Sequence, residues 1–319
     1  MLRRTITHTA SFVAIVAALT LAACSKTAEA PKEEAAPPAP AAVAETPPPA
    51  PANVKEFKIG ELSAMALLDG GIEVPNDNKV FAVGRTPEEV AAVLGGASLP
   101  TDKLNLTIQP LLVKSADKVL LFDTGAGGNF GPGAGKLAAS FGEAGVDPQA
   151  VTDIFISHSH GDHIGGLVNA QGALAFPNAK IHLSKPEWKA LSGNEQMAAV
   201  VAAIKPKVEA FTPGAELVPG VVKAVEIKGH TPGHSGYLIS SGAESLLYVG
   251  DSMHHYVVSV QKPDWTIAFD GDAPTAQKSR ADLIAASAAS GQRIYAVHFP
   301  FPGLGKFEKQ GDHFAWVAE

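Results

Sequence analysis

The chain has 319 residues, of which 46% are hydrophobic and 18% charged, and its formal net charge is −7 at pH 7. This apolar content is sufficient for a substantial hydrophobic core. Nucleic-acid binding needs concentrated lysine and arginine, so we expect no nucleic-acid partner for this acidic chain. The only cysteine is Cys24, which leaves the residues after it without a disulfide or a thiolate metal ligand.

The N-terminus has the pattern of an export signal. Arg3 and Arg4 precede an apolar stretch at 11–23, which is shorter than the roughly 20 residues that a membrane-spanning helix needs. The end of this stretch, LAAC at 21–24, resembles a bacterial lipobox, in which the cysteine is lipidated and becomes the first mature residue. We therefore predict a lipoprotein signal peptide at 1–24. The protein would be exported and anchored to a bacterial membrane by lipid on Cys24, facing the periplasm or the cell surface. A soluble secreted protein with an ordinary cleavage site is the alternative.

Residues 25–53 are dominated by alanine and proline and show no hydrophobic periodicity. Such a segment cannot bury enough apolar surface to offset the entropy of ordering it. We interpret it as a disordered tether, with the folded domain at 54–319.

In chain order, the domain mixes β-type and helical patterns. Its first half predicts strands or strand pairs at 57–74 and 104–125, helices at 87–96 and 136–145, a glycine-rich loop at 125–135, and a strand at 151–157. Its second half predicts helices at 167–174, 186–193, 195–211 and 274–290, and strands at 179–184, 221–229, 237–241, 244–251 and 293–299. This mixture favours an α/β fold in which two β-sheets are flanked by helices.

Residues 157–167 read SHSHGDHIGGL and follow the predicted strand at 151–157. A turn can direct successive side chains into one cavity, whereas a regular strand would send them to opposite faces. Imidazole and carboxylate groups suit Zn²⁺, Mn²⁺, Co²⁺ or Fe. Because four ligands so close in sequence can hardly surround one ion, two ions sharing the cluster is the better interpretation.

Other metal-capable side chains lie where later strands end. The loop 229–234 reads GHTPGH and offers His230 and His234, Asp251 ends the strand at 244–251, and His298 lies at the end of the last strand. Side chains at strand ends are held by a rigid scaffold, as a binding site requires.

In this order, the motifs HSHGDH, GHTPGH, GD and a late histidine, together with Asp123 in LLFDTG, resemble the metallo-β-lactamase superfamily over residues 57–319. The resemblance implies an αββα sandwich with two divalent metal ions, Zn²⁺ being the first choice. It also implies seven ligands, which are His158, His160, His234, Asp162, His163, His298 and Asp251, the last as the bridge. GDSMHHYVV, HFPFPGLG and DTGAGGNFGP are similar to the branch that contains methyl parathion hydrolase and quorum-quenching lactonases.

This resemblance implies hydrolysis of an ester, lactone or phosphotriester by a hydroxide shared between the metals. Asp251 and Asp162 are then the catalytic carboxylates, with Asp162 as the candidate for proton transfer. Asp123 would hydrogen-bond a ligand loop without binding metal, and His230 would be structural. A β-lactamase that uses only histidine and aspartate ligands and a non-catalytic metal-binding lipoprotein are the alternatives.

The substrate is expected to be a small molecule, and a homodimer is one option for the assembly. Apolar side chains should shape the pocket, and the candidates are Phe130, Trp188, Phe299 and Phe301. Many lactonases of the superfamily have a tyrosine three residues after the bridging aspartate. Here that position is His254, whose imidazole could replace the phenol at the substrate carbonyl.

Overall fold

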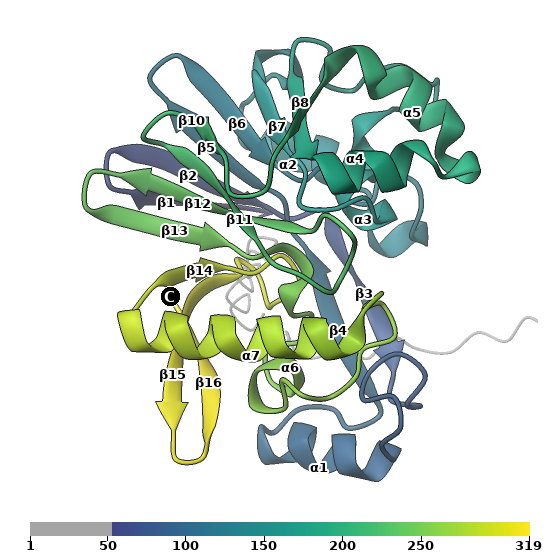
Figure 1. Ribbon diagram of the computed structural model, residues 1–319, viewed down its shortest axis with the longest axis vertical. Coiled ribbons are helices and arrows are strands. Elements are labelled where there is room, and N and C mark those ends of the chain that lie inside the picture. Colours follow the sequence, from purple (N-terminus) through teal and green to yellow (C-terminus); the bar gives the residue numbers. More distant parts are fainter. Residues whose placement is uncertain (1–52) are drawn as a thin grey trace, which may run out of the picture. The chain divides into compact units, whose positions relative to one another are not determined.

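Two seven-stranded sheets form the centre of residues 53–319, the part of the chain that the computed structural model describes (Figure 1). The predicted signal peptide at 1–24 and the predicted tether at 25–53 lie outside this part, apart from Asn53. Among the described residues, no helix has both the length and the apolar character that crossing a membrane would need.

The first sheet has the strand order β1-β2-β5-β6-β7-β8-β9. Its strands are β1 (Val54–Ile59), β2 (Leu62–Leu67), β5 (Leu111–Ser115), β6 (Lys118–Phe122), β7 (Asp153–Phe155), β8 (Lys180–Ser184) and β9 (Val208–Phe211). The strands β6 to β9 pair in parallel, so their carboxyl ends meet at one edge of the sheet.

The second sheet has the order β10-β11-β12-β13-β14-β15-β16, and its only parallel pair is β13–β14. Its strands are β10 (Glu216–Val218), β11 (Val222–Glu226), β12 (Ser235–Ser241), β13 (Glu244–Tyr248), β14 (Arg293–Tyr295), β15 (Leu304–Gln310) and β16 (His313–Ala318). A separate two-stranded sheet pairs β3 (Gly70–Pro75) with β4 (Lys103–Ile108).

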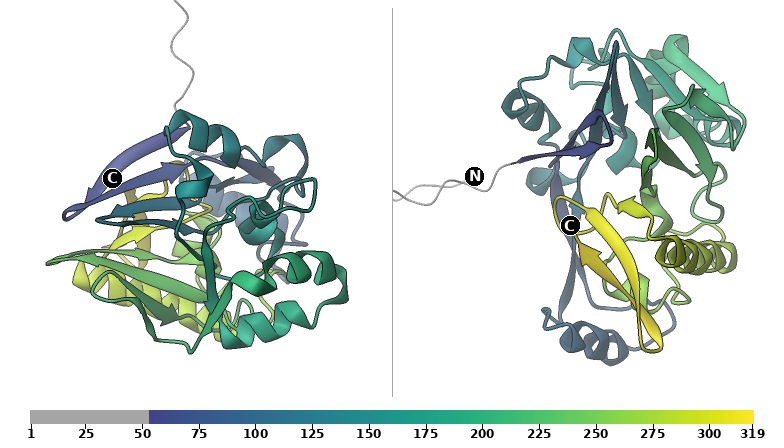
Figure 2. Two further views of the ribbon diagram at one scale, coloured as in Figure 1. Left: turned by 90° about the horizontal axis from the view of Figure 1, so that it is seen from above. Right: turned by 90° about the vertical axis from the view of Figure 1, so that its left-hand side faces the viewer.

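Helices cover the outer faces of both sheets (Figures 1 and 2). The helices of the described residues are α1 (Pro87–Gly96), α2 (Leu137–Glu143), α3 (Gly161–Ile164), α4 (Lys185–Ser192), α5 (Ala198–Ile204), α6 (Val258–Gln261) and α7 (Ala273–Ser290), of which α1 packs with β3 and β4 and α3 lies in the turn that follows β7. Phe141 of α2, Leu191 of α4 and Ile204 of α5 pack in one apolar cluster with the first sheet. Ile284 of α7 packs with Ile294 of the second sheet. This arrangement is the predicted αββα sandwich.

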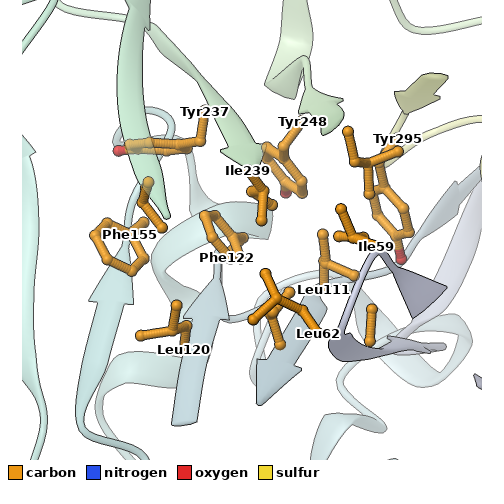
Figure 3. Close-up of a cluster of buried hydrophobic side chains, with 14 of the residues drawn as sticks. Ile59, Leu62, Leu111, Leu120, Phe122, Phe155, Tyr237, Ile239, Tyr248 and Tyr295 are labelled. Atoms are coloured by element: carbon orange, nitrogen blue, oxygen red, sulfur yellow. The ribbon is translucent and has the colours of Figure 1, made fainter. Parts of the chain in front are cut away.

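Aromatic side chains fill the space between the two sheets (Figure 3). Phe122 and Phe155 come from the first sheet, with ring centroids 5.0 Å apart. Tyr237 and Tyr248 of the second sheet lie 5.6 Å and 5.8 Å from the Phe122 ring. All four side chains are fully buried. Because each ring removes a large apolar area from water, this layer holds the sheets, and therefore their loops, in fixed relation.

Most predicted elements are confirmed, but the helix predicted at 167–174 is wrong. There the Asn169 side chain accepts the backbone N–H groups of Gln171 and Ala173, and an isolated bridge joins Val168 to Leu174. An asparagine that satisfies local donors in this way stabilises a turn in preference to a helix. The helix predicted at 195–211 is shorter, because α5 ends at Ile204, just before Pro206, and 208–211 forms β9.

His255 sits at the start of α6 and gives the fold a pH dependence. Its Nδ1 accepts the backbone N–H groups of Val257 and Val258, and burial lowers its pKa from 6.5 to about 4. Between these values the unfolded chain binds a proton that the folded protein excludes, so the free energy of unfolding falls as the pH drops below 6.5. Above 6.5 neither state is protonated and the effect vanishes.

We expect this one residue to remove about 2 kcal/mol of stability between pH 7 and pH 5. Urea unfolding of the wild type and of His255→Asn measures it, because asparagine can accept the same N–H groups without titrating. Every other titrating group is common to both proteins, so equal pH slopes would contradict the expectation.

Candidate metal centre

The segment that leaves β7 and enters α3 carries four polar ligand-type side chains. Asp123, at the end of β6, accepts hydrogen bonds from the backbone N–H and the hydroxyl of Ser157, both at 2.7 Å. This anchors the chain just before His158. His160 then has an extended backbone (φ −70°, ψ 156°) and caps α3. The local turn therefore directs residues 158–163 toward one place, as the sequence predicts.

Residues from distant loops complete two groups of ligand-type atoms. Within each group the donor atoms all lie within 4.8 Å of one another. The first group is His158, His160, His230 and Asp251, and the second is Asp162, His163 and His298. Six of the seven predicted ligands are thus brought together, and His230 is the added member.

Imidazole nitrogens converge in the first group. The Nε2 atom of His230 lies 3.1 Å from Nε2 of His158 and 3.1 Å from Nδ1 of His160. All three rings also lie within 4.7 Å of one another, centroid to centroid. Three nitrogen donors that face a common point match the ligand set of a divalent zinc-type ion.

Asp251 lies between the two groups. Its Oδ2 is 3.6 Å from Nε2 of His158 and 3.5 Å from Nε2 of His230, whereas its Oδ1 is 3.1 Å from Nε2 of His163 and 3.0 Å from Nε2 of His298. One carboxylate oxygen therefore faces each group. This is the arrangement that a bridging ligand requires.

The polar atoms at the centre fit metal ions. His163 Nε2 and Asp251 Oδ1 are buried without a hydrogen-bond partner. A buried polar atom without a partner costs free energy unless something else satisfies it. Imidazole and carboxylate donors on both sides of Asp251 are the ligands that divalent transition metals prefer, so the residues present fit two such ions.

The two groups differ in their electrostatics. Burial lowers the pKa of His158 and of His160, and neighbouring imidazoles lower it further, so both rings are neutral and able to donate a lone pair. Burial alone would also lower the pKa of His163, but Asp251 and Asp162 raise it above its ordinary value. The second group therefore attracts positive charge strongly.

Asp251 is ionised in this surrounding. Burial by itself would raise the pKa of its carboxyl group, but the imidazoles of His163 and His298 outweigh this and hold the pKa well below its ordinary value. A carboxylate with a lowered pKa and one oxygen facing each group is suited to bind cations.

The structure corrects the prediction for the 229–234 loop. His234 Nδ1 donates to the Ile227 carbonyl at 3.1 Å, and its Nε2 accepts the Asp251 backbone N–H at 2.9 Å. Both ring nitrogens are thus engaged, and none is left for a metal. His234 instead holds the backbone of the bridging residue. His230, for which a structural role was predicted, lies among the ligand-type atoms of the first group.

Gly250 explains how His234 comes so close to the Asp251 turn. Its φ is +51°, and a Cβ atom there would lie 2.6 Å from Nε2 of His234. Any larger residue would push the imidazole away, in addition to straining the backbone.

Asp123 has the predicted role of a residue that orients a ligand. Its Oδ2 lies 2.7 Å from Nδ1 of His163 and accepts the hydroxyl of Tyr248 at 2.7 Å. It adopts a left-handed backbone (φ +57°), a conformation that aspartate and asparagine tolerate better than most residues. His298 is oriented similarly, with Nδ1 2.7 Å from the Thr107 carbonyl.

Sequence reasoning missed two other carboxylates that support the ligand loops. Asp270 Oδ1 lies 2.9 Å from Nδ1 of His230, although its surrounding sequence reads as an ordinary loop. Glu187 of α4 accepts the backbone N–H of Ser159 at 2.8 Å and that of Gly233 at 2.9 Å, which joins the two histidine loops. No spacing in the sequence marks either residue, because both act across contacts between distant elements.

A cavity of about 270 Å³ opens onto both groups. It is lined by Ile72, Leu106, Phe130, His160, Gly161, Asp162, Asp251, His254, Phe269 and His298. A larger cavity of about 470 Å³ lies behind the loop of His230, but its lining includes no member of either group. The smaller cavity is therefore the one that adjoins the ligand-type atoms.

Two of the five predicted pocket residues line this cavity. Phe130 and His254 line it, whereas Trp188, Phe299 and Phe301 do not. Trp188 packs with the outer cluster of the first sheet, and Phe299 is buried under the second sheet with its ring 4.9 Å from Trp316. Phe301 packs against the central core. Each of the three finds apolar neighbours in the fold, so none faces the site.

Asp123→Asn should weaken metal binding on the side of His163. Asparagine keeps the shape of the Asp123 side chain and tolerates the same left-handed backbone, but it removes the negative charge beside the His163 ring. Loss of such an outer carboxylate typically lowers metal affinity about 10–100-fold. Chelator competition measures this, and the ion held by His158, His160 and His230 should be retained. Unchanged affinity of both ions would contradict the role of Asp123.

Comparison with known proteins agrees with this geometry. Residues 108–298 match the family model of the metallo-β-lactamase superfamily. No match was found among curated proteins. Among solved structures, AidC, a dizinc quorum-quenching lactonase, is 32% identical with a TM-score of 0.79, and the match covers 84% of this chain and 97% of that one. The hydrolase AbOPH of the β-lactamase superfamily is 26% identical with a TM-score of 0.77, over 84% and 98% of the two chains.

A more distant structure has the same fold. A probable metal-dependent hydrolase from Staphylococcus aureus is 21% identical with a TM-score of 0.68, and the match covers 82% of this chain and 99% of that one. The family match, the 32% identity to AidC and the paired histidine–aspartate groups agree. The chain belongs to the metallo-β-lactamase superfamily and is a metal-dependent hydrolase.

Proposed function

We propose that the protein is a dinuclear hydrolase whose substrate is a small lactone with an apolar side chain. The observation that carries this proposal is Asp251, which turns one oxygen to each ligand group beside a cavity with apolar walls. The likeness to AidC, a dizinc quorum-quenching lactonase, supports two ions and a lactone ring. Zn²⁺ is the metal we expect, with Mn²⁺, Co²⁺ or Fe as alternatives.

Two divalent ions bound here would lower the pKa of a shared water and polarise the substrate carbonyl. The residues of the chain position the two ligand groups and shape the cavity. Asp251 sets the separation of the two groups. Ile72, Leu106 and Phe130 exclude water around the ring and give an apolar group its contacts. No serine or cysteine nucleophile is required.

Asp162 is our candidate for the proton transfer to the leaving oxygen. It lines the cavity, and its Oδ2 lies 3.5 Å from Nε2 of His298 and 3.6 Å from Nε2 of His163. It is thus both within the second group and within reach of a bound substrate. A carboxylate in this position can hold a proton between the two halves of the reaction.

His254 is our candidate for contact with the substrate carbonyl. Both of its ring nitrogens are buried without a hydrogen-bond partner, and Nε2 lies 3.2 Å from Asp251 Oδ2. The ring stacks on His298, with centroids 5.6 Å apart and planes 8° apart. An imidazole that lines the cavity and makes no hydrogen bond can offer a ring nitrogen to a ligand.

A substrate panel on protein of measured metal content tests the proposal. The panel contains an N-acyl homoserine lactone, an aryl ester, paraoxon and nitrocefin. Hydrolysis of the lactone at the highest kcat/KM, with two metal equivalents per chain, is expected. Preference for nitrocefin would indicate a β-lactamase, and preference for paraoxon a phosphotriesterase. Two bound metals without any turnover would indicate a non-catalytic metal-binding protein.

Phe130→Ala should raise KM for a lactone with a hexanoyl chain about tenfold and leave kcat nearly unchanged. The ring lines the cavity and is 38% exposed, so a bound apolar chain would cover it. Trp188→Ala is the matched control, because that ring lies outside the cavity and its loss should not alter KM. Equal effects of the two substitutions would show that the pocket is elsewhere.

We also propose that the protein is held at a bacterial membrane by lipid on Cys24, as the LAAC sequence suggests. Cys24→Ser should then move the protein from the membrane fraction to the soluble fraction of the producing cells. Continued membrane association of this variant would contradict the anchor.

A further inference from the structure

Arg280 is a buried charge on α7, outside every sequence motif. Its side chain is 1% exposed. Its Nη2 donates to Asp270 Oδ2 at 2.7 Å, its Nε donates to the Ser252 carbonyl at 2.8 Å, and its Nη1 donates to the Pro263 carbonyl at 3.0 Å. These three contacts tie α7 to the turn after β13 and to the loop that precedes α7.

Two of these contacts lead to candidate metal ligands, one through Asp270 to His230 and the other through Ser252 to Asp251. Asp270 receives Arg280 on one oxygen and, with the other, lies 2.9 Å from Nδ1 of His230. Ser252 directly follows Asp251, so a hydrogen bond to its carbonyl restrains the turn that carries the bridging carboxylate. One guanidinium therefore touches the supports of both residues.

Stability alone does not account for a buried ion pair here. Removing two charges from water is expensive, and well-packed apolar residues often stabilise a fold at least as well. The pair instead fixes the orientation of the groups around Arg280. Guanidinium presents its donors in a rigid planar fork, and this geometry can fix three acceptors at once, whereas a lysine ammonium is a single point.

We propose that Arg280 is a positioning residue for metal binding. It orients His230 through Asp270, and it fixes the backbone turn of Asp251 through the carbonyl of Ser252. This inference rests on the proposed dinuclear centre. Asp270 aims the His230 ring and acts on the first group only. Arg280 supports Asp270 and the bridging turn, so it acts on both groups.

These roles predict different losses of metal affinity in the variants of Asp270 and Arg280. Asp270→Asn should weaken the ion held by His158, His160 and His230 about 10–100-fold and leave the other ion unaffected. Arg280→Lys keeps the charge but loses the fork, and it should weaken both ions. The control is Asp153→Asn. Asp153 is also a buried carboxylate, 2.9 Å from Nε2 of His182 and 2.8 Å from Nζ of Lys118, but it belongs to neither group.

The experiment is a chelator titration of the full chain loaded with Zn²⁺, with released metal counted per chain and thermal unfolding of each chelated protein recorded alongside. The expected result is one weakened ion in Asp270→Asn, two in Arg280→Lys and none in Asp153→Asn. Variants that lose only thermal stability, with unchanged affinity for both ions, would overturn the positioning role. A wild type that binds fewer than two ions would instead refute the dinuclear centre.

A second measurement, which does not need Arg280→Lys to fold, tests the contact between Asp270 and His230 on which the role of Arg280 depends. In Co²⁺-loaded protein, the Nδ1 proton of His230 should give a shifted NMR signal that exchanges slowly with water, because Asp270 accepts it in a buried site. Asp270→Asn identifies the signal by changing its shift and speeding its exchange. An exchange rate that is the same in both proteins would overturn the proposal.

Discussion

His230→Ala is expected to lose one of the two metal equivalents and to lower kcat/KM by roughly three orders of magnitude. The reason is geometric. Its Nε2 lies 3.1 Å from the donor nitrogens of both His158 and His160, so its removal takes one of three imidazoles from the first group. Metal analysis after dialysis and steady-state kinetics on the same preparation measure both effects.

His234→Ala is the matched comparison, because it removes the other histidine of the same loop. Its ring is fully engaged by Ile227 and by the Asp251 backbone, so its loss removes a support of the Asp251 turn but no donor atom, and both metal equivalents should still bind, with lowered affinity. We expect a lower free energy of unfolding instead, by about 2–4 kcal/mol, from the cavity and the two broken hydrogen bonds. Loss of a metal equivalent in His234→Ala but not in His230→Ala would reverse the assignment of this loop.

Asp251→Asn should have the largest effect of any single substitution. An amide has one oxygen and one NH₂ group, so it can accept a metal on one side only and turns a donor toward the other. It also removes the negative charge that faces His163 and His298. We expect at most one metal equivalent and a fall in kcat/KM of about 10⁴-fold or more.

Asp162→Asn makes the same chemical change within the second group alone. Asp162 lies at the edge of the site, with its side chain 12% exposed, and faces only His163 and His298. The Asp162→Asn variant should keep the ion of the first group, and its activity should fall less than that of Asp251→Asn. Two tightly bound equivalents in Asp251→Asn, or equal losses in the two variants, would show that Asp251 does not bridge.

Local sequence patterns predicted most strands of the two sheets, because the decisive information is local, but they missed β9, β10, β15 and β16. Runs such as LLVKS and KVLLF have the β-rich, apolar character of buried strands, and they form β5 and β6. The error at 167–174 has the same origin, since the pattern gave no weight to the Asn169 side chain as an acceptor for nearby N–H groups. Helix propensity is a weak preference that such a bond overrides.

The chemistry of the site was also visible in the sequence. The residues 158–163 supply their donors from a single turn, and Asp251 and His298 follow β13 and β14, a parallel pair whose ends meet at one edge. Six members of the two groups could therefore be predicted without the fold. The roles of Asp270, Arg280 and Glu187 could not be predicted. Each of these residues contacts its partner across an interface between elements that are distant in the sequence.

The sequence by itself determined the two facing sheets, the kind of donor atoms and the loops that carry them. Only the tertiary structure decided between His230 and His234, which share a loop and an identical side chain. The physical reason is that an imidazole can bind a metal only through a nitrogen that nothing else uses. That depends on which ring meets the Ile227 carbonyl and the Asp251 N–H in the folded protein.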